Sequence, residues 1–411
     1  MERKNVWTKD FTLITIGTII SAIAWQTINL PLSLMVFDET GSTLMSAILF
    51  ISGMIPSVIL PILIAPIIDR NPKKKIIVLL DYLTGFLFLL IAYIVNITGF
   101  QYYLYLLFSL IMGVIGTIYH LAYQAWFPDI IPVGFEQQGF AVSSSIYPTV
   151  TIVMSPIAAF LYKTYSISLL FVIIGILTLI AASFEIFISN IHKGEMDSEF
   201  DFKQYKLDIL GGFNFLKEEK GIRNIYTYMS VTNGVANGMF LMVQAYFQTV
   251  SFLTVTMLAF LRSAETVGRI IGGFVQYKVK IKPEKRFGIT KFVYIFYELM
   301  DLILLFIPYP IMIINRFLCG LLGMTSATLR ETSVQSYLPS NMRAKVNAVF
   351  NVFMSIAIIL FQIVAGFLGD RIGYRPVVII LTSLSLISIF IFIVLPSDEN
   401  RKVYETIRIT N

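Results

Sequence analysis

Two apolar runs of the sequence meet at the stretch 65-APIIDRNPKKK-75. The runs cover residues 44–68 and 76–97, and each is long enough to cross a bilayer, which takes about 20 residues of helix. The stretch combines the acid–base pair Asp69 and Arg70 with three lysines. Lysine and arginine gather in the cytoplasmic loops of membrane proteins. The stretch therefore predicts a short cytoplasmic loop between two membrane-spanning helices.

Composition extends this prediction to the whole chain. Of its 411 residues, 56% are hydrophobic and only 14% are charged, so the chain is far more apolar than a soluble domain. One cysteine, Cys319, and two histidines, His120 and His192, provide neither a disulfide framework nor a metal site. No phosphate-binding loop, nucleophile elbow or zinc-protease motif is present. The composition predicts a polytopic membrane protein that is not an enzyme and needs no metal or cofactor.

Twelve apolar segments of spanning length follow one another along the chain. They cover residues 11–37, 44–68, 76–97, 102–127, 139–162, 166–189, 225–250, 253–275, 287–307, 310–330, 346–368 and 376–395. One long polar stretch divides them into six and six. The pattern predicts an N-terminal bundle over residues 1–189, a cytoplasmic linker over 190–224 and a C-terminal bundle with a short tail over 225–411. Within the linker, residues 206–219 place apolar residues among charged ones, a pattern that predicts a partly amphipathic surface helix.

Basic residues set the orientation of these spans. Most of the 31 lysines and arginines fall in the termini, the linker and alternate loops when the N-terminus is placed inside. We therefore expect a multi-pass protein of the cell (cytoplasmic) membrane with both termini in the cytoplasm. The net charge of +6 reflects this topology, so the bilayer is an expected partner and nucleic acid is not.

The loop at residues 65–75 resembles the loop between helices 2 and 3 of the major facilitator superfamily, G-x-L-a-D-R-x-G-R-[RK]. The matching acidic and basic positions are Asp69, Arg70, Lys73 and Lys74. Ala65 and Pro72 stand where the family has glycine. The resemblance implies an all-α membrane fold of two six-helix bundles, with this loop as a conformational latch. A carboxylate at Asp69 would face the N-terminus of span 346–368, near Ser340 or Asn341. The alternative is a helix end with solvated charges.

Two further copies of this loop pattern occur in the sequence. Residues 273–278 keep a glycine and a basic tail, but Tyr277 replaces the acid. The stretch 366-GFLGDRIGYR-375 matches the pattern better than the first copy does. It follows span 346–368, so the predicted topology places it outside. Three-helix inverted repeats within each half would produce such a copy.

A second motif lies in span 139–162. The stretch 151-TIVMSPIAA-159 resembles the antiporter motif g-x-x-x-G-P-x-x-G-G, with Thr151, Ser155 and Ala159 in place of glycine around Pro156. Small residues at this spacing let helices approach closely, and proline permits a kink. The resemblance implies export, whereas the alternative is helix packing without a bearing on direction.

Uncharged polar residues mark a candidate substrate cavity. The resemblance places the first, fourth, seventh and tenth spans around the centre of the fold. The uncharged polar residues in the first, fourth and seventh spans are Gln26, Asn29, His120, Gln124, Asn233, Asn237 and Gln244. Together with aromatic neighbours, these side chains would suit a bulky, mostly apolar or weakly cationic molecule. For any single residue, a hydrogen bond between helices is the alternative.

Charges inside spans are costly and therefore informative. Span 253–275 carries Arg262, Glu265 and Arg269 on one helix face, and later spans carry Glu298, Asp301 and Arg316. The first bundle shows no acid near the middle of a span, because Asp69 and Asp81 are expected near the inner face. We therefore predict Glu265, Asp301 or His120 as the proton-coupling group, with Glu265 slightly favoured. Structural ion pairing among these charges is the alternative.

The first half of the chain also resembles the twelve-helix drug:proton antiporter group that contains macrolide-efflux-type exporters. The Thr40-Gly41-Ser42 turn and the Phe127-Pro128-Asp129 loop carry this resemblance. It implies a monomeric exporter that moves hydrophobic or amphipathic small molecules in exchange for protons. Two alternatives remain open, namely a lipid or lysolipid flippase of the same fold and a membrane interaction protein that does not transport.

Overall fold

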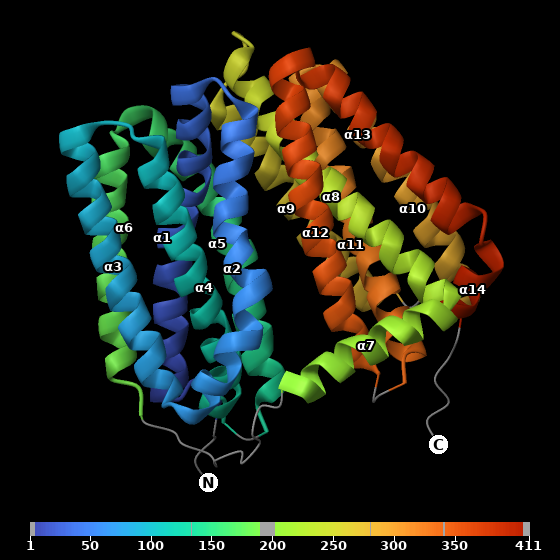
Figure 1. Cartoon of the computed structure of the whole chain (residues 1–411), viewed down its shortest axis with the longest axis horizontal. Coiled ribbons are helices and arrows are strands. Elements are labelled where there is room, and N and C mark those ends of the chain that lie inside the picture. The colour runs from blue at the N-terminus through green and yellow to red at the C-terminus, as the bar shows by residue number, and fades with distance from the viewer. Residues whose placement is uncertain (1–4, 133, 190–201, 280, 340–341, 406–411) are drawn as a thin grey trace. The chain divides into compact units, whose positions relative to one another are not determined.

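A computed structural model describes residues 5–132, 134–189, 202–279, 281–339 and 342–405 of the chain (Figure 1). Every regular element among these residues is a helix. Their bounds are α1 Lys9–Thr40, α2 Thr43–Arg70, α3 Lys73–Thr98, α4 Tyr102–Ile130, α5 Glu136–Thr164, α6 Ile167–Ile186, α7 Phe202–Glu218, α8 Lys220–Thr249, α9 Val255–Lys278, α10 Pro283–Ile303, α11 Tyr309–Tyr337, α12 Arg343–Ile372, α13 Tyr374–Ile389 and α14 Ser397–Glu405. Two short segments complete the set, the 3₁₀ turn η1 Leu304–Phe306 and the π-helical turn η2 Phe390–Val394.

Local sequence explains where several helices begin and end. The hydroxyl of Thr8 accepts from the Phe11 N–H at the start of α1, and Ser166 and Thr254 cap α6 and α9 in the same way. A side-chain oxygen satisfies a backbone donor that a helix N-terminus leaves free. Gly41 ends α1 in a left-handed conformation, with φ of 65°, that glycine adopts without strain.

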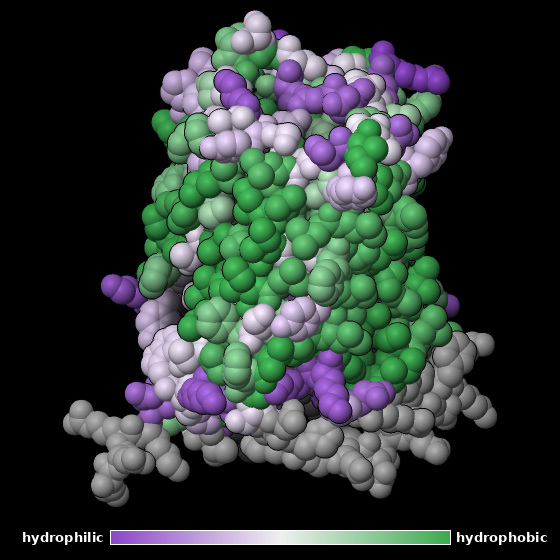
Figure 2. Space-filling model, turned by 90° about the vertical axis from the view of Figure 1, so that its left-hand side faces the viewer, coloured by the Kyte–Doolittle hydropathy of each residue, from purple (hydrophilic) through white to green (hydrophobic). Residues whose placement is uncertain are grey.

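Nine of the described helices are long and apolar enough to cross a membrane, namely α1 to α6, α11, α12 and α13. The other three predicted spans correspond to α8, α9 and α10, which carry more polar and charged residues. Figure 2 shows one face of the molecule, on which a broad apolar band separates two polar ends. Such a band is the surface that a bilayer requires.

One helix illustrates how a lipid-facing side is separated from a buried side. The exposed apolar residues of α3 recur every three or four positions: Leu79, Leu83, Phe86, Leu90, Tyr93 and Ile97. The opposite side of α3 holds Ile77, Leu80, Phe88 and Ile91 in the protein interior. Asp81 lies on this buried side. Its carboxyl group is therefore directed into the bundle, away from lipid.

The chain divides into two compact units. The first unit comprises Met1–Gly41 and Ile48–Phe200, and the second comprises Ser42–Ala47 and Asp201–Asn411. The first residues of α2 thus belong with the second unit, although the rest of that helix belongs to the first. The reason is a set of hydrogen bonds between Ser42, Thr43 and Asp370.

Close packing of α3 against α6 organises the first unit. A Cβ atom added at Gly85 would lie 3.1 Å from the Gly175 carbonyl oxygen, so the two backbones touch through glycines. Phe88, Phe108 and Phe171 fill the space beside this contact. The tight interface sets the facing positions on the two helices, including Asp81 and Glu185.

The second unit contains elements that extend beyond the predicted spans. The surface helix predicted at residues 206–219 is confirmed as α7, which packs against α12. Helix α8 begins at Lys220, inside the predicted linker, because Gly221 lets it approach the backbone of Glu399 in α14. The short tail also forms this unexpected helix. Tyr404 of α14 is fully buried and its hydroxyl lies 3.1 Å from that of Tyr294.

Candidate functional site

The first unit encloses a cavity of about 550 Å³ among α1, α3, α4, α5 and α6, which we call the aromatic cavity. Seven Trp, Tyr and Phe rings line it: Trp25, Phe88, Tyr119, Tyr123, Phe127, Phe140 and Tyr147. Short polar side chains, including Thr18, Ser21 and Thr84, interrupt this surface. Small-molecule sites in proteins have this size and this mixture of apolar walls and few polar groups.

A second cavity of about 530 Å³ lies beside the aromatic cavity, among α1 to α4 of the same unit. Trp25, Phe88, Met112, Gly116 and His120 line both spaces, which makes them neighbours. The polar groups of the second cavity include amides, hydroxyl groups and the imidazole of His120, with no acid among its described lining residues. The first unit therefore contains two adjoining apolar cavities, with one acid among their described lining residues.

Asp81 supplies that charge. Among the described residues that line the aromatic cavity, it is the one acid. The residue is only 7% exposed, and its Oδ2 atom has no hydrogen-bond partner among the described residues. A buried carboxyl oxygen without a donor is unusual and costly in a protein interior.

Glu185 of α6 faces Asp81 across the α3–α6 interface. Glu185 is fully buried, and the two carboxyl groups are within hydrogen-bond reach of each other. Neither Oε1 nor Oε2 finds a donor in the part of the chain that the structure describes. Gly17 of α1 leaves room for the side chain, since a Cβ atom there would lie 3.2 Å from Glu185 Oε1. We call Asp81 and Glu185 the acid pair.

No described basic side chain forms an ion pair with the acid pair. Lys74, on the same helix as Asp81, instead donates to the carbonyls of Ile186 and Ile188 at 2.7 and 2.5 Å. Its ammonium therefore binds the C-terminal end of α6, where the helix dipole favours a cation. The charge of the acid pair is left without a compensating cation among the described residues.

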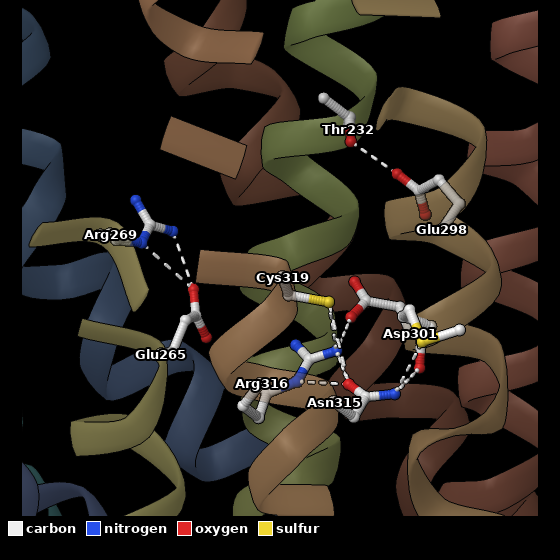
Figure 3. A network of polar contacts seen from close by, with 9 residues as sticks. Thr232, Glu265, Arg269, Glu298, Asp301, Asn315, Arg316 and Cys319 are labelled. Carbon is white, nitrogen blue, oxygen red and sulfur yellow. Dashed lines mark hydrogen bonds and ion pairs between the residues drawn. The ribbon is translucent and has the colours of Figure 1, made fainter. Parts of the chain in front are cut away.

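In the second unit, the buried acids Asp301 and Glu298 have ion-pair or hydrogen-bond partners (Figure 3). Asp301 of α10 forms an ion pair with Arg316 of α11, and the Asn315 side chain accepts from Arg316 Nε at 3.0 Å. Glu298 accepts hydrogen bonds from Thr232 at 2.8 Å and from Ser385 at 2.5 Å. Asp301 has no basic residue within one turn of its own helix, but packing of α10 on α11 brings Arg316 to it.

Glu265, the favoured coupling group, is also ion-paired. Its Oε1 atom lies 2.8 Å from Arg269 one helical turn away (Figure 3). Arg262 turns instead over the ring of Phe240, at 3.9 Å from the ring centre. The structural ion pairing considered as the alternative is therefore present for both Glu265 and Asp301.

The predicted cavity residues separate into two groups. In the first unit, Asn29 lines the second cavity, Gln124 lines the aromatic cavity and His120 lines both. Gln26 instead joins α1 to α5, because its Nε2 donates to Thr151 Oγ1 at 2.7 Å. In the second unit the amide groups bind within their own helix: Asn233 to Met229, Asn237 to Asn233 and Gln244 to Gln248.

The antiporter-like motif lies in α5 where that helix packs against α1. Ser155 donates to the Thr151 carbonyl at 2.6 Å, and Ala159 is fully buried. Pro156 lies inside the helix, as predicted. Small residues therefore allow α1 and α5 to pack closely. This packing is compatible both with an export motif and with helix packing that has no bearing on transport direction.

The predicted latch falls partly outside the described residues. This applies to the side chains of Asp69 and Arg70, and to Ser340 and Asn341, so the contact between them stays a prediction. Lys74 is placed and binds α6, as described above. The third copy of the loop pattern, however, has such a contact. The Asp370 carboxylate accepts from the Thr43 N–H and the Ser42 hydroxyl, both at 2.6 Å, at the N-terminus of α2.

Sequence reasoning missed the acid pair. Asp81 is expected near the inner face of the membrane, and Glu185 is not among the predicted site residues. One signal was available, because the buried positions of α6 recur every three or four residues: Leu170, Phe171, Ile174, Gly175, Thr178, Ala181, Ala182 and Glu185. An acid that continues an apolar stripe is a candidate for a buried polar site.

Comparisons with known proteins agree with this architecture. Macrolide efflux protein A of Streptococcus pyogenes is 23% identical over 292 residues, which cover 68% of this chain and 70% of the relative. Among solved structures, the nucleoside transporter NupG matches with a TM-score of 0.69 at 12% identity, over 93% of this chain and 98% of the other.

Two further solved structures share the fold. A bacterial homologue of the human lysosomal transporter Spinster, in an inward-facing and unoccupied conformation, has a TM-score of 0.65 at 12% identity over 96% of each chain. The E. coli fucose:proton symporter FucP has a TM-score of 0.58 at 17% identity, over 94% of this chain and 98% of the symporter. The predicted all-α fold with twelve transmembrane helices in two six-helix bundles is therefore confirmed.

The sequence family gives the same result over nearly the whole chain. The family model of the Major Facilitator Superfamily matches residues 14–297 and 292–408. This range includes the cavities, the acid pair and the ion-paired acids of the second unit. The chain belongs to the Major Facilitator Superfamily, whose members transport small molecules.

Proposed function

We propose that this transporter exports hydrophobic or amphipathic small molecules from the cytoplasm in exchange for protons. The observation that carries the proposal is the aromatic cavity, in which rings surround a single buried acid, Asp81. Apolar walls take up the hydrophobic body of a substrate, and one acid provides a group that protonation can switch.

Two other observations support this function. The similarity to macrolide efflux protein A favours an amphipathic drug-like substrate. Nucleosides and fucose, which the names of the solved neighbours mention, are more polar than the walls of the aromatic cavity. Alternating access, both termini in the cytoplasm and a monomeric carrier in the cell membrane form part of the same proposal.

The latch at Asp69 belongs to this proposal as well. In such a carrier, a carboxylate at a helix N-terminus would hold one side closed and release when the bundles move. The contact of Asp370 with the N-terminus of α2 supports the idea, because it joins the equivalent acid of the third copy to a helix end. Lys73 and Lys74 would then serve as the basic end of the loop.

Transport into inside-out vesicles tests the function. Vesicles that contain the full chain are compared with matched vesicles that lack it, and both have a lumen more acidic than the outside. The substrate panel is a macrolide, a lincosamide, a cationic dye, a lysolipid and a nucleoside. We expect gradient-driven uptake of the macrolide or the dye, abolished by a protonophore. Uptake of the lysolipid alone would support the flippase instead, and uptake of none would contradict export.

A further inference from the structure

We propose that the acid pair, Asp81 and Glu185, is the exchange site of this carrier, at which a bound proton leaves when an organic cation enters the aromatic cavity. The inference rests on the proposed function and deepens it, because it names both the coupling residues and the substrate class. That class is a lipophilic monocation or protonated amine.

The surroundings of the pair show why it must hold a proton when the cavity is empty. Both side chains are at least nine-tenths buried, and no described cation lies against them. Two carboxylates accept hydrogen bonds but cannot donate to each other. With a proton between them, one oxygen becomes a donor, and Glu185 gains the partner that it otherwise lacks. A shared proton also removes the repulsion of two like charges in a medium of low dielectric constant.

The cavity wall shows what could replace that proton. Trp25, Tyr119, Tyr123 and Tyr147 present aromatic rings to the same cavity as Asp81. The face of an aromatic ring attracts a cation, and the attraction is strongest where water is excluded. An ammonium or phosphonium group in this space would meet both the rings and the carboxyl group of Asp81, which lines the same cavity. A neutral ligand would meet the rings alone.

Charge balance defines the exchange. One monocation enters the cavity, one O–H bond of the acid pair breaks, and that proton passes to solvent. The net charge of the buried site is the same before and after, because the cation takes the place of the proton. In reverse, protonation of the pair removes the anion that held the cation. Substrate and proton therefore compete for one site.

The other titratable groups around the pair do not supply the missing charge. Tyr119 and Tyr123 approach from α4 and Tyr147 from α5. On α3, the Tyr82 hydroxyl lies 3.0 Å from Ser183 of α6. Helix α1 contributes only Gly17, Thr18 and Ser21 at this level, and Thr18 binds Tyr123.

Two basic groups remain to be considered. Lys74 holds the carbonyls at the end of α6, so it does not neutralise the pair. His120 lines the α4 wall of the aromatic cavity, and its Nε2 atom lies 2.8 Å from the Gln124 amide. A histidine could bind and release a proton itself, so the experiment below must separate it from the pair.

Calorimetry on the purified full-length protein tests the exchange. The probe is tetraphenylphosphonium, a permanent monocation that carries no proton of its own. Titration in buffers of different ionisation enthalpy counts the protons released on binding. We expect about one proton per bound cation, and an affinity that rises about tenfold per pH unit until the pair has lost its proton.

Variants identify the source of the proton. Asp81→Asn removes the carboxylate of the cavity wall, so it should bind the cation weakly at every pH and release no proton. Glu298→Gln, at a buried acid of the second unit, and His120→Ala should both keep the release. Release that persists in Asp81→Asn, or that disappears only in His120→Ala, would overturn the assignment. So would cation binding by the unaltered protein with no proton released at any pH.

An infrared measurement on the unaltered protein tests the proposal without any variant, so its result does not depend on whether the variants fold. The infrared carbonyl band of a protonated carboxyl group should disappear from the unaltered protein when tetraphenylphosphonium binds. A band that persists would contradict the proposal. Failure here is distinct from failure of the proposed function, because gradient-driven export of an uncharged substrate from vesicles would still support the exporter and would contradict only the exchange site.

Discussion

The two units each bury a pair of acids, yet they stabilise them in opposite ways. In the second unit, Arg316 pairs with Asp301, and two hydroxyl groups donate to Glu298. In the first unit, Asp81 and Glu185 face each other with no described cation beside them. Burial of an acid therefore does not by itself identify a coupling residue; its neighbours decide the role.

The difference has a physical basis. An ionised carboxylate is expensive to bury unless a cation or several donors compensate it. Arg316 provides this compensation permanently, so Asp301 has no reason to change its protonation state during transport. The acid pair lacks permanent compensation, which leaves a proton or a substrate cation to provide it. The second unit thus holds a structural brace, and the first unit holds the site that can change.

The largest effect should follow from removing the cation of the second unit. Arg316→Met leaves Asp301 buried without its partner, and we expect a loss of about 3–5 kcal/mol of stability. Thermal unfolding of the detergent-solubilised protein, followed by size-exclusion chromatography, measures this loss. The double variant Arg316→Met with Asp301→Asn should recover much of the stability. An unchanged melting temperature in the single variant would mean that the ion pair is not a brace.

Removing one acid of the first unit should abolish coupling rather than stability. Asp81→Asn keeps the size of the side chain and removes the exchangeable proton, so an imposed pH gradient should no longer drive uptake into inside-out vesicles. Downhill exchange of a labelled uncharged substrate, which needs only the aromatic walls, should continue. The same assay on Asp301→Asn, at matched expression, provides the comparison between units. Gradient-driven uptake that survives in Asp81→Asn would place coupling elsewhere.

A smaller effect is expected from crowding the pair without changing its charge. A methyl group at position 17 would lie 3.2 Å from Glu185 Oε1, so Gly17→Ala must push that side chain aside. Overpacking of this kind costs about 1–3 kcal/mol. Melting temperatures of Gly17→Ala, Glu185→Ala and the double variant measure the coupling between the two positions. Strictly additive changes would show that the residues do not interact.

The smallest effect should come from an amide at the hydrogen-bonded acid of the second unit. Glu298→Gln keeps an oxygen that accepts from Thr232 or Ser385, and we expect a stability loss of about 1 kcal/mol. Proton-driven uptake should be unchanged. A large loss of uptake with a normal melting temperature would indicate that both units carry coupling acids, and the contrast between them would fail.

Sequence reasoning predicted the helices, the family and the surface helix α7 because these depend on local patterns. Apolar runs of spanning length, the polar linker and the loop at residues 65–75 can each be recognised within a short window. It also predicted a carboxylate at a helix N-terminus, for Asp69. The described contact of this type belongs to Asp370, in the copy that matched the family pattern better.

The environment of each acid could not be read in the same way. By sequence alone, Asp301 has no basic residue within one helical turn, and Asp81 is expected near the inner face of the membrane. Packing of α10 on α11 brings Arg316 to Asp301, and packing of α3 on α6 through Gly85 and Gly175 brings Glu185 to Asp81. These partners lie far apart along the chain. Their meeting depends on which helix faces are buried together, and not on any local spacing.

The sequence by itself therefore determined that this chain is a helical membrane transporter with its spans, linker and basic loop. Length, hydropathy and charge act on each segment separately, so they can be evaluated without a fold. Tertiary structure alone decided that the first unit buries an acid pair without a described cation, with Asp81 in the cavity wall, whereas Asp301 of the second unit pairs with Arg316 and Glu298 accepts two hydroxyl hydrogen bonds. The free energy of a buried charge depends on its neighbours, and only packing brings those neighbours together.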